Sequence, residues 1–178
     1  DVNSVDNSWV MGGSCNWSNP ANLINDYNNI IFIQDQALAK AYTIEFEEMW
    51  SGVFGTHKID NTPHKFIVDG KEIELYFSPS DQTTSKILNF IEQVDHSLEF
   101  ALLSFTRDDL GSAVIDKDIE FNVYVRGILE SQNTNGSEYD NLINGGVNVR
   151  SHMGVTHQLH HKYAIADANF PSSRPSVL

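Results

Sequence analysis

A histidine and a lysine lie two residues apart near the end of the sequence, and an aspartate follows them. The segment His160–Asp167 reads H-x-K-x4-D, with the mostly apolar spacer Tyr163–Ala166. On a β-strand, residues two apart point to the same face, so His160 and Lys162 are expected side by side. An ammonium group can neutralise a phosphate anion, and an imidazole can attack phosphorus or transfer a proton. The spacing therefore predicts a site for phosphate chemistry around His160.

A second polar segment lies near the start of the chain, where Gly13–Trp17 reads G-S-C-N-W. Together, H-x-K-x4-D and G-S-x-N resemble the phospholipase D superfamily, whose members include phospholipases, cardiolipin synthases, nucleases and related transferases. In that family G-S-x-N follows the H-x-K-x4-D motif, whereas here it precedes the motif. The resemblance covers nearly the whole chain, in a permuted order.

The inverted order has a simple explanation in a protein with two repeats. Asp1-Val2-Asn3 parallels Asp167-Ala168-Asn169, so Asp1 is interpreted as the last residue of an upstream motif. The chain would then span the end of one repeat and the start of the next. The expected organisation is the C-terminal part of a first repeat over 1–52, a linker over 53–70, and the N-terminal part of a second repeat over 71–178. A natural protein with one motif and a coincidental G-S-x-N is the alternative.

The resemblance implies a role for each motif residue. His160, Lys162 and Asp167 would be catalytic: His160 lies in the active site, Lys162 contacts phosphate, and Asp167 organises the motif. Ser14 and Asn16 would bind the substrate phosphate, although a glycine turn with ordinary side-chain hydrogen bonds would explain them as well.

Active sites in this family combine two H-x-K-x4-D motifs, and the resemblance implies the same arrangement for this chain. One histidine attacks phosphorus to form a phosphohistidine, and the other protonates the leaving oxygen. A second motif is therefore expected, either from an upstream repeat or from a homodimer mate. The sequence leaves open which role His160 takes. Tyr27 stands where the family often has a glutamate, and Asp26 is a weak substitute for that carboxylate.

Two other histidine patterns have less specific explanations. His64 and Lys65 are adjacent, so on a strand they would face opposite sides, and a structural role is expected. The four histidines His152, His157, His160 and His161 suggest zinc, but adjacent His160 and His161 would also face opposite sides. The resemblance implies neither a metal nor another cofactor.

The amino-acid composition limits the kinds of binding partner that are expected. The 178 residues carry a net charge of −13 with only 11 Lys and Arg, which disfavours non-specific binding to long nucleic acids and to anionic membranes. The single cysteine, Cys15, excludes an internal disulfide framework. No apolar run has the length of a membrane span, and no leader is visible. The compartment stays open, including secretion and the cell envelope.

Strand-like and helix-like segments alternate, which predicts an α/β fold: a mixed, mostly central β-sheet flanked by helices on both faces. The residues of 51–70 are expected to form a connector. Strands are expected at 29–34, 72–78, 98–105, 121–129, 147–152 and 160–166. Helices are expected at 35–50, 83–97, 108–115 and 137–144.

The functional hypothesis is a phospholipase D-type phosphodiesterase that hydrolyses or transfers a phosphodiester through a phosphohistidine, with a phospholipid as substrate. One alternative is a nuclease of the same type that cleaves DNA or RNA. A second is a non-catalytic, phosphate-binding or structural half. The polar loop 132–137 and the insert 154–158 are interpreted as borders of the cleft, since substrate choice depends on loops.

Overall fold

The computed structural model describes residues 3–18, 21–119, 121–130 and 135–178 of the chain. Asp1 and part of the polar loop 132–137 lie outside the described residues. The chain divides into two compact units, which are described separately: Asp1–Gly12 with Ile31–Lys86, and Gly13–Ile30 with Ile87–Leu178. No helix in the described part of the chain is both long and apolar enough to cross a bilayer.

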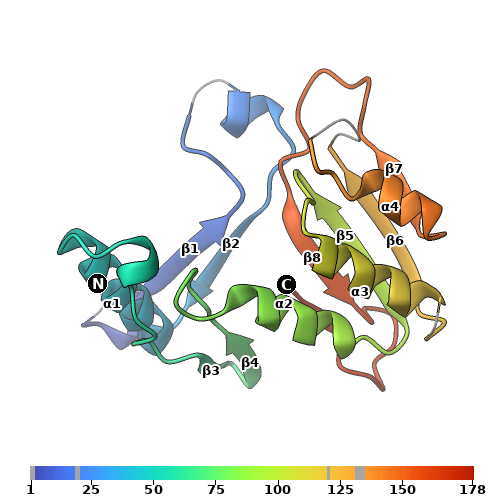
Figure 1. Ribbon diagram of the computed structural model, residues 1–178. Helices are drawn as coiled ribbons and strands as arrows, with labels where there is room; N and C mark the ends of the chain where they lie inside the picture. Colours follow the sequence, from blue (N-terminus) through green and yellow to red (C-terminus); the bar gives the residue numbers. More distant parts are fainter. Residues whose placement is uncertain (1–2, 19–20, 120, 131–134) are drawn as a thin grey trace. The chain divides into compact units, whose positions relative to one another are not determined.

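The first unit combines one long helix with two small two-stranded sheets (Figure 1). Asp35 caps the helix, because its carboxylate accepts the Leu38 N–H at 2.7 Å. The elements are β1 (Trp9–Gly13), β2 (Ile30–Gln34), α1 (Gln36–Trp50), β3 (Lys65–Val68) and β4 (Lys71–Glu74). Their buried side chains form one core of Val10, Leu38, Ala39, Ala41, Phe66 and Leu75.

Strand β3 occupies part of the segment that was expected to be a connector. It pairs with β4 in antiparallel register, from Lys65 opposite Glu74 to Val68 opposite Lys71. The turn between them is Asp69-Gly70, and both residues have positive φ, at 48° and 73°. An Asp-Gly pair with this backbone matches the twist of a tight hairpin. The signal for this hairpin was therefore present in the sequence.

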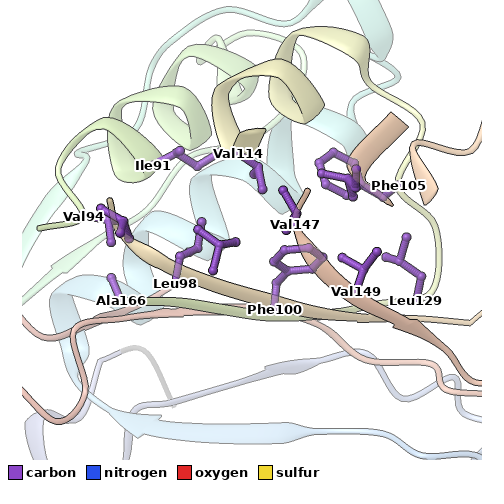
Figure 2. Close-up of a cluster of buried hydrophobic side chains, with 13 residues drawn as sticks. Ile91, Val94, Leu98, Phe100, Phe105, Val114, Leu129, Val147, Val149 and Ala166 are labelled. Carbon is purple, nitrogen blue, oxygen red and sulfur yellow. The ribbon is translucent and has the colours of Figure 1, made fainter. Parts of the chain in front are cut away.

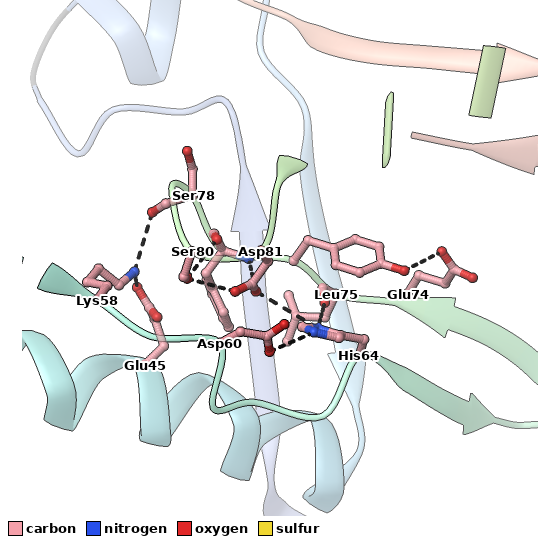
Figure 3. Close-up of polar contacts among 11 residues, drawn as sticks. Glu45, Lys58, Asp60, His64, Glu74, Leu75, Ser78, Ser80 and Asp81 are labelled. Atoms are coloured by element: carbon pink, nitrogen blue, oxygen red, sulfur yellow. Dashed lines mark hydrogen bonds and ion pairs between the residues drawn. The ribbon is translucent and has the colours of Figure 1, made fainter. Parts of the chain in front are cut away.

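His64 has a structural role in the first unit (Figure 3). Its Nδ1 lies 3.0 Å from the Leu75 carbonyl oxygen, and its Nε2 lies 2.9 Å from an Asp60 carboxylate oxygen. Asp81 lies close by, but its carboxylate already accepts the N–H of Phe77 at 2.7 Å. These hydrogen bonds account for the Asp60, His64 and Asp81 cluster, which also has the spacing of a metal-ligand group. A buried ion pair between Lys58 and Glu45 lies in the same unit.

The second unit is built on a five-stranded mixed sheet in the order β7-β6-β5-β8-β9. Strands β5, β6 and β7 are parallel, whereas β8 runs antiparallel to β5 and to β9. The strands are β5 (Ser97–Leu102), β6 (Tyr124–Leu129), β7 (Asn148–Ser151), β8 (Lys162–Ala166) and β9 (Ser176–Val177). The helices are α2 (Thr83–Glu92), α3 (Asp108–Ile119) and α4 (Tyr139–Asn144). The prediction of an α/β domain with a mixed sheet is confirmed.

All three of these α-helices contribute to one hydrophobic core (Figure 2). Ile91 from α2, Val114 from α3 and Leu142 from α4 pack with Leu98 and Phe100 of the sheet. The expectation placed helices on both faces, but in the described part of this unit the α-helices pack on a single face. The opposite face carries the alternate residues of the same strands. They line a hollow of about 530 Å³ that includes Glu99, Tyr124, Arg126, Arg150, Tyr163 and Ile165.

Helix α2 ends at Glu92, earlier than the hydrophobic periodicity predicted. The residues from Asp95 to Ser97 cannot continue the helix, because all three of their N–H groups bind the Asp167 carboxylate. A long-range contact, which the periodicity does not encode, thus sets the boundary between α2 and β5.

Gly127→Ala should destabilise the second unit. A Cβ at position 127 would lie 2.2 Å from ring atoms of Phe100, which is buried in the core. Overpacking of this kind costs about 1–3 kcal/mol. Urea unfolding should show the loss, whereas Gly12→Ala, whose Cβ would lie 3.9 Å from Ile31, should have little effect. Equal stability of the two variants would contradict the tight packing of Phe100 over Gly127.

Candidate phosphodiester site

His160 is buried immediately before β8, with 9% of its surface exposed. Its Nδ1 lies 2.7 Å from the Ser14 carbonyl oxygen and 3.1 Å from Asn28 Oδ1, and its backbone N–H donates to the Tyr27 carbonyl at 2.9 Å. A carbonyl oxygen can only accept, so the contact with Ser14 requires a proton on Nδ1. The neutral ring therefore carries its lone pair on Nε2.

Lys162 is the first residue of β8, and its ammonium group lies beside the imidazole. Its Nζ is 3.5 Å from His160 Nδ1 and donates to the His160 carbonyl at 3.2 Å. Partial desolvation lowers the pKa of Lys162 from its ordinary value. The structure thus brings together the two side chains that the two-residue spacing predicted to share a face.

Asp167 lies at the other end of β8 and is almost completely buried. Its carboxylate accepts three backbone N–H groups: Asp95 at 3.1 Å, and His96 and Ser97 at 2.8 Å each. Burial alone would raise its pKa. The hydrogen bonds from these N–H groups and from the Ser173 side chain outweigh burial and hold the pKa below the ordinary value. Asp167 thus fastens the end of the motif strand to the start of β5.

Ser14 reaches His160 through its backbone. Its hydroxyl donates to Asn28 Oδ1 at 3.0 Å and accepts the Asn29 N–H at 3.1 Å, which holds the start of the loop after β1 in place. Asn16 lies exposed in the same loop. Among the described residues, the hydrogen-bond partners of His160 are Ser14, Asn28, Tyr27 and Lys162 rather than Asn16.

His161 has surroundings different from those of His160. Its Nδ1 lies 3.3 Å from Asn29 Oδ1, and its ring meets the Tyr163 ring edge-on with a centroid separation of 5.2 Å. Desolvation, and then the nearby His160, lower its pKa. The two adjacent histidines therefore contact different partners, as expected for neighbours in extended backbone.

Three consecutive backbone N–H groups lead into the motif, and each has its own acceptor. The Gln158 N–H donates to Asp26 Oδ1 at 3.1 Å, and the Leu159 N–H donates to Glu130 Oε2 at 2.6 Å. The His160 N–H donates to the Tyr27 carbonyl, as described above. Glu130 and Asn28 were not predicted from the sequence, although Glu130 directly follows β6, where a polar residue marks a strand end.

Residues 2–50 match a family model described as "Cardiolipin synthase, PLD-like domain". The match confirms the resemblance to the phospholipase D superfamily over this segment, which contains G-S-x-N and precedes H-x-K-x4-D. No curated protein matches the chain significantly. The crystal structure of a phospholipase D family member, Nuc from Salmonella typhimurium, is similar over 51% of this chain, with 23% identity and a TM-score of 0.43. The similarity spans 60% of that protein's chain.

Proposed function

We propose that the chain acts as a phospholipase D-type phosphodiesterase whose nucleophile is His160. The observation that carries the proposal is the contact between His160 Nδ1 and the Ser14 carbonyl at 2.7 Å. It places the ring proton on Nδ1 and leaves the Nε2 lone pair free for attack. A positioned imidazole with this tautomer is an effective nucleophile near neutral pH.

In the first step, His160 Nε2 attacks phosphorus, a P–N bond forms and the P–O bond to the leaving alcohol breaks. The leaving oxygen takes a proton from a second acid. Water or an acceptor alcohol then attacks phosphorus and gives its proton to the now deprotonated second acid, the P–N bond breaks, and the product leaves as a phosphomonoester or a new diester. The Lys162 ammonium group, 3.5 Å from the imidazole, offsets the phosphate charge in both steps.

The second acid would be the histidine of another H-x-K-x4-D motif, from an upstream repeat or from a homodimer mate. Two copies of one chain that meet across a twofold axis bring the same residue together from both sides. In this proposal Ser14 and Asn16 belong to the phosphate pocket, and Asp167 holds the motif strand in place.

The preferred substrate class is a phospholipid. A cavity of about 370 Å³ lies next to Lys162, and most of its lining is apolar. Phe90, Leu102, Phe105, Leu110 and Leu178 belong to this lining. An apolar cavity beside a cation suits a molecule that carries both a phosphate and a hydrocarbon group. The net charge of −13 also disfavours a long polyanion as substrate.

A nuclease is the second candidate, because one surface of the acidic chain gathers arginines. Arg126 and Arg150 line the hollow on the face of the sheet opposite the α-helices of this unit, together with Tyr124, and the Arg126 guanidinium lies 5.6 Å from the Tyr124 ring centroid. Arginines beside aromatic rings suit single-stranded nucleic acid. A non-catalytic half that only binds phosphate is the third candidate.

The chain should form a phosphoryl-enzyme intermediate without a metal ion. Incubation with a short-chain phosphatidylcholine, with a single-stranded oligonucleotide and with bis(p-nitrophenyl) phosphate, each in EDTA, would be followed by rapid quenching in alkali. Mass spectrometry should find the phosphoryl adduct on the peptide that contains His160. An unmodified His160 during measurable turnover would overturn the covalent mechanism. Turnover that EDTA stops and one divalent ion restores would overturn the metal-independent one.

A further inference from the structure

Glu130 occupies a junction between the central sheet and the segment that enters the motif. It directly follows β6, and one carboxylate oxygen serves two partners. This Oε2 accepts the Leu159 N–H at 2.6 Å and lies 3.1 Å from His152 Nδ1. Hydrogen bonds to an ionised carboxylate are short and about twice as strong as neutral ones. Glu130 therefore fixes the backbone one residue before His160.

His152, which directly follows β7, completes this junction. Its side chain is 13% exposed and that of Glu130 is 21% exposed, so the pair is largely shielded from water. The His152 ring also meets the Tyr27 ring edge-on, with a centroid separation of 5.2 Å. Tyr27 in turn accepts the His160 N–H through its carbonyl at 2.9 Å. His152 thus contacts both residues that hold the backbone of positions 159 and 160.

A second carboxylate near this segment, that of Asp26, binds the backbone less strongly than Glu130 does. Asp26 accepts the Gln158 N–H at 3.1 Å, a longer bond that lies in an exposed position. Water can replace an exposed acceptor at low cost, whereas a partly buried N–H without an acceptor is costly. The buried Leu159, with 7% of its surface exposed, therefore depends on Glu130 more than Gln158 depends on Asp26.

We propose that Glu130, oriented by His152, is a positioning residue that sets the place of the His160 imidazole for attack on phosphorus. The proposal rests on the proposed function of His160. Glu130 acts through the Leu159 backbone, so its removal should affect the chemical step more than substrate binding. A displacement of about 1 Å in a reacting group can lower the rate about a hundredfold.

The test compares Glu130→Ala, Glu130→Gln and Glu99→Ala in the full chain. Glu99 is a control of similar exposure, since its side chain is 20% exposed, and it lies within β5 and pairs with Arg126 rather than with the motif segment. With bis(p-nitrophenyl) phosphate, Glu130→Ala should lower kcat about tenfold to a hundredfold, with KM unchanged within about twofold. Glu130→Gln keeps a carbonyl acceptor for the Leu159 N–H and should recover most of kcat. Glu99→Ala should retain the original kcat.

An independent measurement separates this proposal from the proposed function. Nitrogen-15 NMR of the His160 ring reports its tautomer and hydrogen bonds without any turnover. The ring signals should shift in Glu130→Ala, return toward the original in Glu130→Gln, and stay unchanged in Glu99→Ala. An inactive wild-type chain with these shifts would remove the proposed function and keep the positioning role. Unchanged signals, or full kcat, in a folded Glu130→Ala protein would overturn the positioning role, as would a Glu130→Gln protein as impaired as Glu130→Ala.

Discussion

His160→Ala should abolish phosphodiester hydrolysis, with a loss in kcat of roughly a thousandfold or more. The variant removes the Nε2 lone pair that the Ser14 carbonyl contact leaves available, so no P–N bond can form. The substitution also removes the side chain of a residue that is only 9% exposed, so circular dichroism should establish that the variant remains folded. Initial rates with bis(p-nitrophenyl) phosphate and with a short-chain phosphatidylcholine provide the measurement.

Lys162→Ala should also reduce the rate, by about a hundredfold to a thousandfold, because the phosphate loses its fixed cation.

The adjacent His161→Ala provides a matched control for His160→Ala: it removes an imidazole of the same strand segment that contacts Asn29 rather than Ser14. This control should keep most of the activity. A His160→Ala protein with the wild-type rate, or a His161→Ala protein that is equally inactive, would contradict the assignment.

The parts of the fold that the sequence predicted well are those with local signals. The amphipathic pattern and the Asp35 cap define α1, which spans Gln36–Trp50 against an expected helix at 35–50. The apolar runs that became β5, β6 and β8 were found within a few residues. The parts that sequence reasoning missed depend on partners far along the chain. The end of α2 depends on Asp167, which lies about seventy residues away and takes the N–H groups of positions 95–97.

The same difference between local signals and long-range contacts applies to the candidate site. The two-residue spacing predicted that His160 and Lys162 lie together, and their nitrogens are 3.5 Å apart. Near Tyr27 the sequence offered only Asp26 as a weak substitute for the family's carboxylate, whereas a partly buried carboxylate near the motif comes from Glu130 after β6. The order of strands in the sheet decides which strand end faces the motif, and no local pattern encodes that order. Asn28 was missed for a similar reason, since its contact with His160 joins positions 132 residues apart.

Asp167→Asn should destabilise the second unit by about 2 kcal/mol or more at pH 7. The Asp167 side chain is almost fully buried, and its carboxylate accepts the backbone N–H groups of Asp95, His96 and Ser97. An amide keeps one acceptor oxygen and turns an NH₂ group toward at least one of these donors. Asparagine tolerates the positive φ of 55° at this position, so the backbone conformation itself is retained. Urea unfolding of the two proteins measures the difference.

The same comparison should depend on pH, because hydrogen bonds hold the pKa of Asp167 below its ordinary value in the folded state. A carboxyl group with a lowered folded-state pKa stabilises the protein fully above its unfolded pKa, about 3.9. This contribution is lost as the pH falls through the folded-state pKa. The gap between wild type and Asp167→Asn should therefore be constant from pH 7 to about pH 5 and shrink below about pH 4. Asp118→Asn is a suitable control, since its carboxylate accepts the Val125 N–H over a longer distance of 3.4 Å. A gap that does not change with pH, or one no larger than that of Asp118→Asn, would mean that the Asp167 charge does not hold β8 to β5.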